Sequence, residues 1–116
     1  MFFIGIDVAK RSHQAAVTDI SGNVIVKPFN FKNSSDGFTK FLSIVESNAI
    51  EKNDCTIGLE STGHYWYPLY FFLIENGFDV KVFNPIQTAA FREITIRKVK
   101  NDNLDSLLIA DFTRFG

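Results

Sequence analysis

The sequence predicts a single α/β domain built on a mixed β-sheet flanked by helices. Three strand-like apolar runs come first, at residues 2–8, 13–20 and 23–31. From residue 34 the apolar spacing changes to the helical period, and helical stretches then alternate with strand-like runs at 55–60 and 78–84. The order is therefore βββαβαβ followed by helix. We expect the first three strands to be antiparallel and the helix-linked strands to be parallel.

Length and composition limit the chain to one core. It has 116 residues, of which 46% are hydrophobic and 13 are phenylalanine. A chain of this size can bury a single core but cannot form two lobes with a cleft between them, and its aromatic content excludes a disordered tail. We expect one domain over residues 1–116.

The first three runs have the features of adjacent antiparallel strands. Residues 2–8, FFIGIDV, are almost wholly apolar, which indicates a buried central strand. The letters SGN between the second and third runs predict a hairpin turn, because Gly22 can adopt a positive φ. Pro28 has no N–H group to donate to a sheet, so the third strand should lie at an edge or bulge there.

Two helices should separate the later strands. Ser34 or Ser35 can cap the first of them. Its apolar face would be formed by Phe38, Phe41, Leu42 and Val45. The second covers about residues 64–76, with Pro68 tolerated in its first turn and Asn76-Gly77 closing it.

Helical spacing returns after the last strand. The pair Asn84-Pro85 marks a boundary, and two short helical stretches follow it, the second beginning near Asn101 or Asp102. Four apolar residues would dock that last helix against the sheet: Leu104, Leu107, Leu108 and Phe112.

The sequence has no features of a membrane or secreted protein. No apolar run approaches the roughly 20 residues that cross a bilayer, and the N-terminus lacks the basic region of a signal peptide. The single Cys55 excludes an internal disulfide framework, and we expect it to be a small buried hydrophobe in its strand. These features predict a cytoplasmic location.

Charge is distributed unevenly along the chain. The formal net charge of −1 gives no overall signal for nucleic-acid binding. Positive charge is instead concentrated in REITIRKVK, residues 92–100, where a single acid is present. The basic residues of this stretch are Arg92, Arg97, Lys98 and Lys100.

Two acidic residues stand at strand positions where burial is expected. Asp7 is the only charged residue of the first strand, and burying a lone carboxylate costs several kcal/mol unless it is paired or binds metal. Glu60 ends the strand at 55–60, which a mixed sheet would deliver to its carboxyl edge, where ligands of open α/β sheets bind. If these two strands are neighbours, Asp7 and Glu60 can face the same point.

Two further acids lie together on the expected last helix. Asp102 and Asp105 are three residues apart, so their Cβ atoms would lie about 5–6 Å apart on one helix face. Acids in a first turn also favour the helix macrodipole, so simple capping is the alternative explanation. With Asp7 and Glu60 they would form an oxygen-rich cluster of the kind that binds Mg²⁺ or Mn²⁺. Two such ions about 3.5–4 Å apart would clamp the attacking and leaving oxygens of a phosphodiester displacement.

The order strand acid, strand acid, helix acids on a βββαβαβ chain resembles the RNase H/RuvC-like nuclease fold. Four local motifs are similar to the N-terminal domain of the DEDD transposases, a family that includes Piv-type DNA invertases and bridge-RNA-guided insertion-sequence recombinases. The motifs are GIDVAK (5–10), LESTGHYW (59–66), VFNP (82–85) and KNDNLDSLLIA (100–110). The match spans nearly the whole chain. It places the family's four catalytic and metal-binding acids on Asp7, Glu60, Asp102 and Asp105.

The resemblance implies a metal-dependent DNA recombinase whose acids bind Mg²⁺ or Mn²⁺ and act on a DNA phosphodiester. The implied partners are DNA, a guide (bridge) RNA and further copies of the chain, as a dimer or tetramer of the full-length protein. The basic residues Arg92, Arg97, Lys98 and Lys100 would contact nucleic-acid phosphates. An ordinary solvated face is the alternative.

The chain departs from the family's pattern in two ways. Asn101 stands where the commonest form of the last motif has threonine, which leaves the acids in place. The serine proposed as nucleophile in this family lies in a C-terminal domain, so residues 1–116 would be an excised N-terminal part that cannot recombine DNA by itself. Ser61 does not match that serine, and we expect it to cap a helix or to form a hydrogen bond near the acids.

The motif HYWY, residues 64–67, allows two interpretations. Exposed aromatic side chains can hold unpaired bases by stacking. Alternatively, Trp66 and one tyrosine pack the helix on the sheet, because the apolar helical spacing continues. The residues that continue it are Leu69, Phe72 and Leu73. His64 would either support Glu60 or lie on the surface, and no functional role is expected of His13.

Two other classes of protein compete with this interpretation. A sugar-kinase or actin-like ATPase also has a strand, turn and hairpin carrying a nucleotide-site aspartate, but it needs small residues after that aspartate so that backbone amides can approach phosphate. Here the aspartate is followed by Val8, Ala9 and Lys10, and a second lobe is absent. The other class is a non-catalytic nucleic-acid-binding or dimerisation module in which the acids serve folding alone.

Overall fold

The protein is built on a five-stranded mixed sheet. The computed structural model describes residues 1–94 and 105–116, without the side chains of residues 92–94. The strand order is β3-β2-β1-β4-β5. The strands are β1 (Phe2–Asp7), β2 (Ser12–Asp19), β3 (Val24–Lys32), β4 (Cys55–Glu60) and β5 (Asp79–Phe83). β1, β2 and β3 pair antiparallel, whereas β4 and β5 continue parallel to β1. The predicted order and pairing are confirmed.

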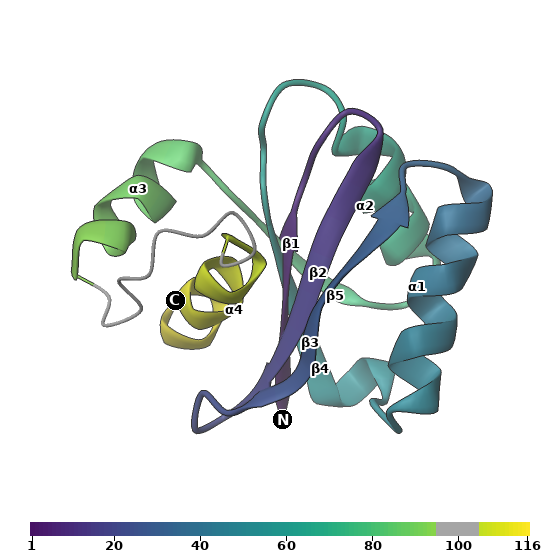
Figure 1. Ribbon diagram of the computed structural model, residues 1–116, viewed down its shortest axis with the longest axis horizontal. Coiled ribbons are helices and arrows are strands. Elements are labelled where there is room, and N and C mark those ends of the chain that lie inside the picture. The colour runs from purple at the N-terminus through teal and green to yellow at the C-terminus, as the bar shows by residue number, and fades with distance from the viewer. Residues whose placement is uncertain (95–104) are drawn as a thin grey trace.

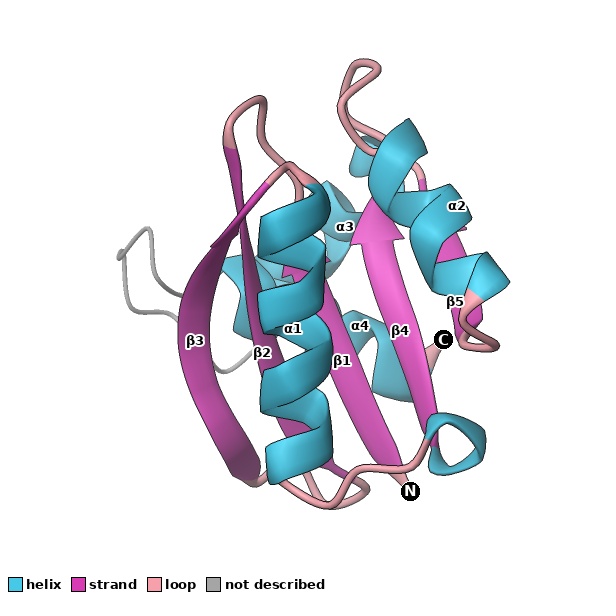
Figure 2. Ribbon diagram, turned by 90° about the vertical axis from the view of Figure 1, so that its right-hand side faces the viewer, coloured by secondary structure: helices cyan, strands magenta, loops and turns pink. Residues whose placement is uncertain are grey.

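Helices cover both faces of the sheet and make three layers (Figure 1). The helices are α1 (Ser35–Ser47), α2 (Tyr67–Glu75), α3 (Pro85–Ile94) and α4 (Asp105–Phe115), and a 3-10 turn, η1 (Lys52–Asp54), precedes β4. Figure 2 shows α1 and α2 in front of the sheet, with α4 behind it. Among the described helices, none combines the length and apolar character needed to cross a membrane.

The antiparallel half of the sheet follows the turn chemistry of its sequence. Gly22, in the β2–β3 turn, has φ of 87°. The carboxylate of Asp19 accepts hydrogen bonds from the backbone N–H groups of Asn23 and Ser21, and the bond from Asn23 is the main reason that the pKa of Asp19 is lowered. β3 is an edge strand, and its register with β2 shifts around Pro28. Both consequences expected of that proline are confirmed.

The helix boundaries follow local signals, with one correction. Ser34 caps α1 by accepting a hydrogen bond from the N–H of Gly37 at 3.2 Å, and Gly77 follows α2 with φ of 85°. Asn84 starts α3 by accepting from the N–H of Ile86 at 2.9 Å. The expected start of α2 at residue 64 is wrong, because the helix begins at Tyr67. Pro68 can occupy only the first turn of a helix, and this holds the start beside it.

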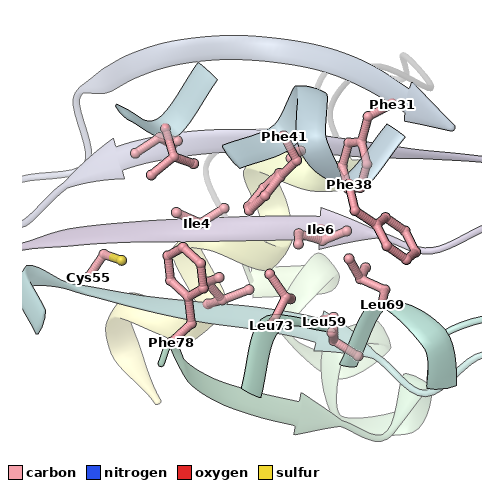
Figure 3. Packing of buried hydrophobic residues seen from close by; sticks show 14 of the residues in the cluster. Ile4, Ile6, Phe31, Phe38, Phe41, Cys55, Leu59, Leu69, Leu73 and Phe78 are labelled. Atoms are coloured by element: carbon pink, nitrogen blue, oxygen red, sulfur yellow. The ribbon is translucent and has the colours of Figure 1, made fainter. Parts of the chain in front are cut away.

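The main hydrophobic core lies between the sheet and the layer of α1 and α2 (Figure 3). Ile4, Ile6 and Leu59 project from the central strands onto this face, and each is fully buried. Burial of a side chain of this size stabilises the fold by about 1.5–3 kcal/mol. Cys55 is 2% exposed at the edge of this core, and burial raises the pKa of its thiol to about 11. The prediction of a small buried hydrophobe is confirmed.

On the opposite face, α4 packs directly on the backbone of the two central strands. Gly5 of β1 and Gly58 of β4 are register partners. A Cβ atom on Gly5 would lie 2.1 Å from the carbonyl oxygen of Ser106 and 2.3 Å from the backbone nitrogen of Ala110. Leu107 and Leu108 are buried as predicted, Leu104 lies outside the described residues, and half-buried Phe112 contacts the rings of Phe83 and Phe91. The glycine notch that admits the helix was not predicted.

The two glycines of this notch face different parts of α4: Gly5 faces helix backbone, and Gly58 faces the side chain of Thr113. Substitutions can distinguish these two kinds of contact. We expect Gly5→Ala to lower the free energy of unfolding by about 1–3 kcal/mol or more, because the new methyl group meets helix backbone that cannot move aside. Gly58→Ala should also destabilise, but there the methyl group would lie 1.8 Å from Oγ1 of Thr113. Thr113→Ala should therefore recover part of the loss in Gly58→Ala and none of the loss in Gly5→Ala. Urea unfolding of the single and double variants measures both effects, and equal recovery in the two backgrounds would contradict the packing described.

Candidate active site

Two of the predicted acids end neighbouring strands at the same edge of the sheet. Asp7 is the last residue of β1 and Glu60 the last residue of β4, and the parallel register pairs Ile6 with Leu59 immediately before them. Side chains alternate along a strand, so Asp7 shares the face of Gly5 and Glu60 shares the face of Gly58. Both acids therefore project on the side of the sheet that α4 covers, and both are half-buried. The sequence left open whether these two strands are neighbours, and the structure shows that they are.

The third described acid reaches this edge at the start of α4. Asp105 is the first residue of the helix as described, and it too is half-buried. The next residue, Ser106, is fully buried and donates a hydrogen bond from its hydroxyl to Oε1 of Gln14 at 2.9 Å. Gln14 is the register partner of Asp7 on β2. The bond thus fixes the first turn of α4 beside the end of β1.

The direction of α4 has an electrostatic consequence for these acids. Its first turn lies near Gln14, and Arg114 in its last turn lies against Gly22 at the opposite end of the sheet. The helix therefore runs antiparallel to β1, and the positive end of its macrodipole lies at the edge where Asp7 and Glu60 end their strands. Acidic residues are a common feature of the first turn of a helix, and Asp105 occupies this position. The capping explanation for Asp105 is consequently compatible with the structure.

The described residues bring three carboxylates to one edge without completing a metal cluster. Within residues 1–91 and 105–116, no three His, Cys, Asp or Glu side chains are gathered closely enough to hold a metal ion. Asp7 lies on the central strand, with Glu60 on β4 to one side and the start of α4 above β1 and β2. The fourth predicted acid, Asp102, lies outside the described residues. The oxygen donors are of the type that Mg²⁺ and Mn²⁺ prefer, so the chemistry of the donor set fits a hard divalent cation.

The predicted basic stretch remains a prediction. Arg92 belongs to α3, but its side chain is not described, and Arg97, Lys98 and Lys100 lie outside the described residues.

The loops that follow the two strand acids are held by a polar pair that was not predicted. His13 is fully buried on β2, and its Nδ1 accepts a hydrogen bond from the N–H of Ala9 at 3.1 Å. Asn33 donates from Nδ2 to the carbonyl oxygens of Lys10 and Tyr65, at 3.2 and 3.3 Å. Burial lowers the pKa of His13, and the nearby side chain of Asn33 partly offsets this effect. Neither Nε2 of His13 nor Oδ1 of Asn33 has a hydrogen bond of regular geometry in the described part of the chain.

Nothing in the sequence indicated that His13 and Asn33 would hold the loops that follow β1 and β4. A histidine within an apolar strand has no distinguishing mark, and Asn33 follows the last residue of β3, where a turn residue is ordinary. They hold these loops through partners that can be far away in the sequence; Tyr65, for example, is bonded to Asn33.

The structure also decides the alternatives for Ser61 and for the aromatic motif. Ser61 does not cap α2, whose N-cap is Trp66; its hydroxyl and its N–H both donate to the carbonyl oxygen of Phe83. Trp66 is partly buried and packs against the core, as the packing interpretation requires, but neither tyrosine of the motif is buried with it. Tyr65 and Tyr67 remain exposed, and His64 is a surface residue whose ring stacks on that of Tyr67.

Comparison with solved structures defines the class of the domain. The chain is similar to RuvC of Thermus thermophilus, solved in complex with a Holliday junction substrate, with a TM-score of 0.67 at 13% identity over 100% of this chain and 96% of that one. It is also similar to a ROK hexokinase of Thermus thermophilus, with a TM-score of 0.54 at 18% identity over 80% of this chain and 37% of that one. At these identities the likeness concerns the fold alone. The domain is RuvC-like, with the RNase H type of mixed sheet.

Comparison of the sequence is more specific. A family model described as transposase, of the DEDD type named for IS110, matches residues 4–116. The chain belongs to this DEDD transposase family. It is also 29% identical over 115 residues to y4uE of Sinorhizobium fredii, which is named as a transposase; the match covers 97% of this chain and 31% of that protein. The chain thus spans about a third of the length of the relative. The chain also resembles a hexokinase in its fold, but the family match decides against the sugar-kinase alternative.

The buried histidine makes the stability of the fold depend on pH. Because burial lowers the pKa of His13 in the folded chain, the unfolded chain binds more protons once the pH falls below about 6.5. The contribution of His13 to stability is therefore complete above that pH and declines as the pH falls towards the folded-state pKa. We expect urea unfolding to show a larger loss of stability between pH 7.5 and 5.5 in the wild type than in His13→Gln. His64→Gln, which changes an exposed histidine, should behave as the wild type does; a similar loss in all three proteins would refute the assignment.

Proposed function

We propose that this chain is the RuvC-like catalytic domain of a DNA transposase, which supplies four acidic residues and uses divalent metal to cleave and exchange DNA strands. The observation that carries the proposal is the meeting of Asp7 and Glu60, from two parallel central strands, with the first turn of α4 at one edge of the sheet. Membership of the DEDD transposase family and the RuvC-like fold support it. We also propose that residues 1–116 form one domain of a longer recombinase that assembles as a dimer or tetramer.

The residues proposed to hold the metal are Asp7, Glu60, Asp102 and Asp105. When bound, Mg²⁺ or Mn²⁺ would activate the attacking oxygen and stabilise charge on the leaving oxygen of a phosphodiester. The chain's own contribution is to hold the carboxylates in fixed directions. Asp7 and Glu60 are held by the sheet, and Asp105 is held by the Ser106–Gln14 hydrogen bond and by the glycine notch. Clustered carboxylates repel one another, so a cation is required to bring them to their closest approach.

Nucleic acid is the proposed substrate and partner. RuvC, which shares the fold, was solved with a DNA junction, and this supports DNA as the substrate. A guide (bridge) RNA is proposed on the resemblance to RNA-guided members of the family alone. Arg92, Arg97, Lys98 and Lys100, which neighbour Asp102 and Asp105 in the sequence, are proposed to contact phosphates of either nucleic acid.

A non-catalytic module is the second candidate function. The observation in its favour is that the carboxylates of the described residues do not complete a metal cluster. In that case Asp105 would serve only as a first-turn acid of α4.

Thermal melting with and without metal separates the two candidates. We expect Mg²⁺ or Mn²⁺ at about 100 times its Kd to stabilise the chain by about 2.7 kcal/mol relative to EDTA, because it binds the folded state only. Asp7→Asn and Asp105→Asn should each abolish this rise in Tm. Glu75→Gln, an exposed acid at the end of α2, is the matched control and should retain it. A rise that persists in both aspartate variants would eliminate the proposed site.

The basic stretch can be tested by the salt dependence of DNA binding. We expect the double change Arg97→Ala with Lys98→Ala to weaken binding to all DNA sequences alike, because phosphates carry no sequence information. Loss of two phosphate contacts should reduce the slope of log K against log salt by about 1.8 for duplex DNA. The pair Lys27→Ala with Lys81→Ala, on the exposed sides of β3 and β5, removes the same charge elsewhere. An identical slope of log K against log salt for both double variants would mean that the basic stretch is an ordinary solvated face and does not contact phosphates.

A further inference from the structure

Two loops leave the sheet directly beside the candidate acids. Residues 8–11 follow Asp7 in the β1–β2 connection, and residues 61–66 follow Glu60 before α2 (Figure 1). The amide nitrogen of Asn33 donates to a carbonyl oxygen in each loop, that of Lys10 at 3.2 Å and that of Tyr65 at 3.3 Å. A single side chain therefore fixes the two loops next to one another.

The surface that these loops present is both basic and aromatic. Lys10, Arg11 and His64 are exposed, and Tyr65 and Tyr67 have 42% and 45% of their surface exposed. We name these five residues the basic-aromatic rim. Cations beside exposed aromatic faces are the chemistry by which proteins hold a single nucleic-acid strand, since cations attract phosphates and rings stack on bases.

The rings of the rim rest on a rigid support. The ring of Tyr67 stacks on Trp66 at a centroid distance of 4.3 Å and on His64 at 6.2 Å. Trp66 in turn packs against the hydrophobic core. The backbone of Tyr65 is fixed through its carbonyl oxygen while its ring stays exposed. Binding would consequently require little ordering of the protein, which favours affinity.

Charge limits where a strand can run from this rim. Residues Tyr67–Glu75 of α2 contain no lysine or arginine, so the exposed apolar side of that helix offers phosphates no counter-charge. The cations Lys10 and Arg11 lie on the β1–β2 loop, which follows Asp7 at the end of β1. A nucleic-acid strand that uses both kinds of side chain must therefore extend from the aromatic loop, which follows Glu60, to the basic loop, which follows Asp7.

We propose that the basic-aromatic rim binds an unpaired segment of the DNA strand that is presented to the acids. The inference rests on the proposed transposase function and adds to it the location and the single-stranded character of the DNA. Lys10 and Arg11 hold the phosphates, and the ring of Tyr65 stacks on a base. Inside an intact duplex both faces of a base are covered by the neighbouring base pairs and cannot stack on that ring, so a duplex should bind the rim poorly.

The only tryptophan of the chain provides a direct test, because Trp66 stacks beneath the rim. Titration with a dT 12-mer in Mg²⁺ should change its fluorescence in a saturable way, and the corresponding dA·dT duplex should do so only at higher concentration. Absence of a saturable change, or equal binding of the duplex, would overturn the proposal. Tighter binding of an rU 12-mer than of the dT 12-mer would overturn DNA as the occupant.

Variants assign the binding to the rim. With a labelled dT 12-mer, Tyr65→Ala should weaken binding roughly 5- to 150-fold, which is the range expected for one base stacked on an aromatic ring, while Tyr65→Phe retains it. Lys10→Ala with Arg11→Ala should reduce the salt slope by about 1.4, as for two phosphate contacts of a single strand. Phe71→Ala is the control, because Phe71 is 58% exposed on α2 outside the rim. Equal affinities of Tyr65→Ala and Phe71→Ala would refute the role of the rim.

The melting experiment distinguishes failure of this inference from failure of the proposed function. Rim variants should keep the metal-dependent rise in Tm, because none of their side chains belongs to the proposed metal site. If that rise is present and Tyr65→Ala binds DNA normally, the rim is wrong and the metal-dependent function stands. If the rise in Tm is absent in the wild type while the rim binds the dT 12-mer, the proposed metal-dependent function is wrong and the rim is still a binding site for single-stranded DNA.

Discussion

The close approach of α4 to the backbone of β1 and β4 is the constraint on which the rest of the structure depends. Gly5 and Gly58 lie side by side on the two central strands and leave room for helix backbone where any side chain would collide. The helix that enters this notch begins at an acid and is fixed in register by the Ser106–Gln14 bond. Because Asp7 and Glu60 follow the two glycines by two residues, the packing that admits the helix also orients the acids towards it.

Polar contacts near the edge then determine what surrounds the acids. The positive end of the α4 macrodipole lies at this edge. His13 and Asn33 hold the loops that follow β1 and β4, and both act through backbone groups of those loops. The hydrophobic core on the other face holds the strands together beneath this edge. Packing therefore sets the direction of the acids, and hydrogen bonds set the shape of the surface next to them.

The comparisons show how little the fold alone says about chemistry. The same mixed sheet is found in RuvC, which was solved with a Holliday junction, and in a ROK hexokinase, so the topology by itself does not assign a function. The family match and the acids at the strand ends separate this chain from the kinase. In place of small residues after Asp7 it has Val8, Ala9 and Lys10, which suits a basic loop better than a phosphate-binding turn.

The sequence by itself determined the order of elements, the parallel direction of the helix-linked strands and the position of acids at strand ends, because each depends on local periodicity, turn residues and short-range rules of sheet topology. Gly22, Ser34 and Pro68 act on their own neighbours and could be interpreted in isolation. Only the tertiary structure decided which residues meet across the chain. The contacts of Gly5 with Ala110 and of Asn33 with Tyr65 join segments far apart in sequence, and a glycine or an asparagine carries no local mark of a distant partner. Such contacts exist only once the sheet and its helices have been brought together by the burial of apolar surface.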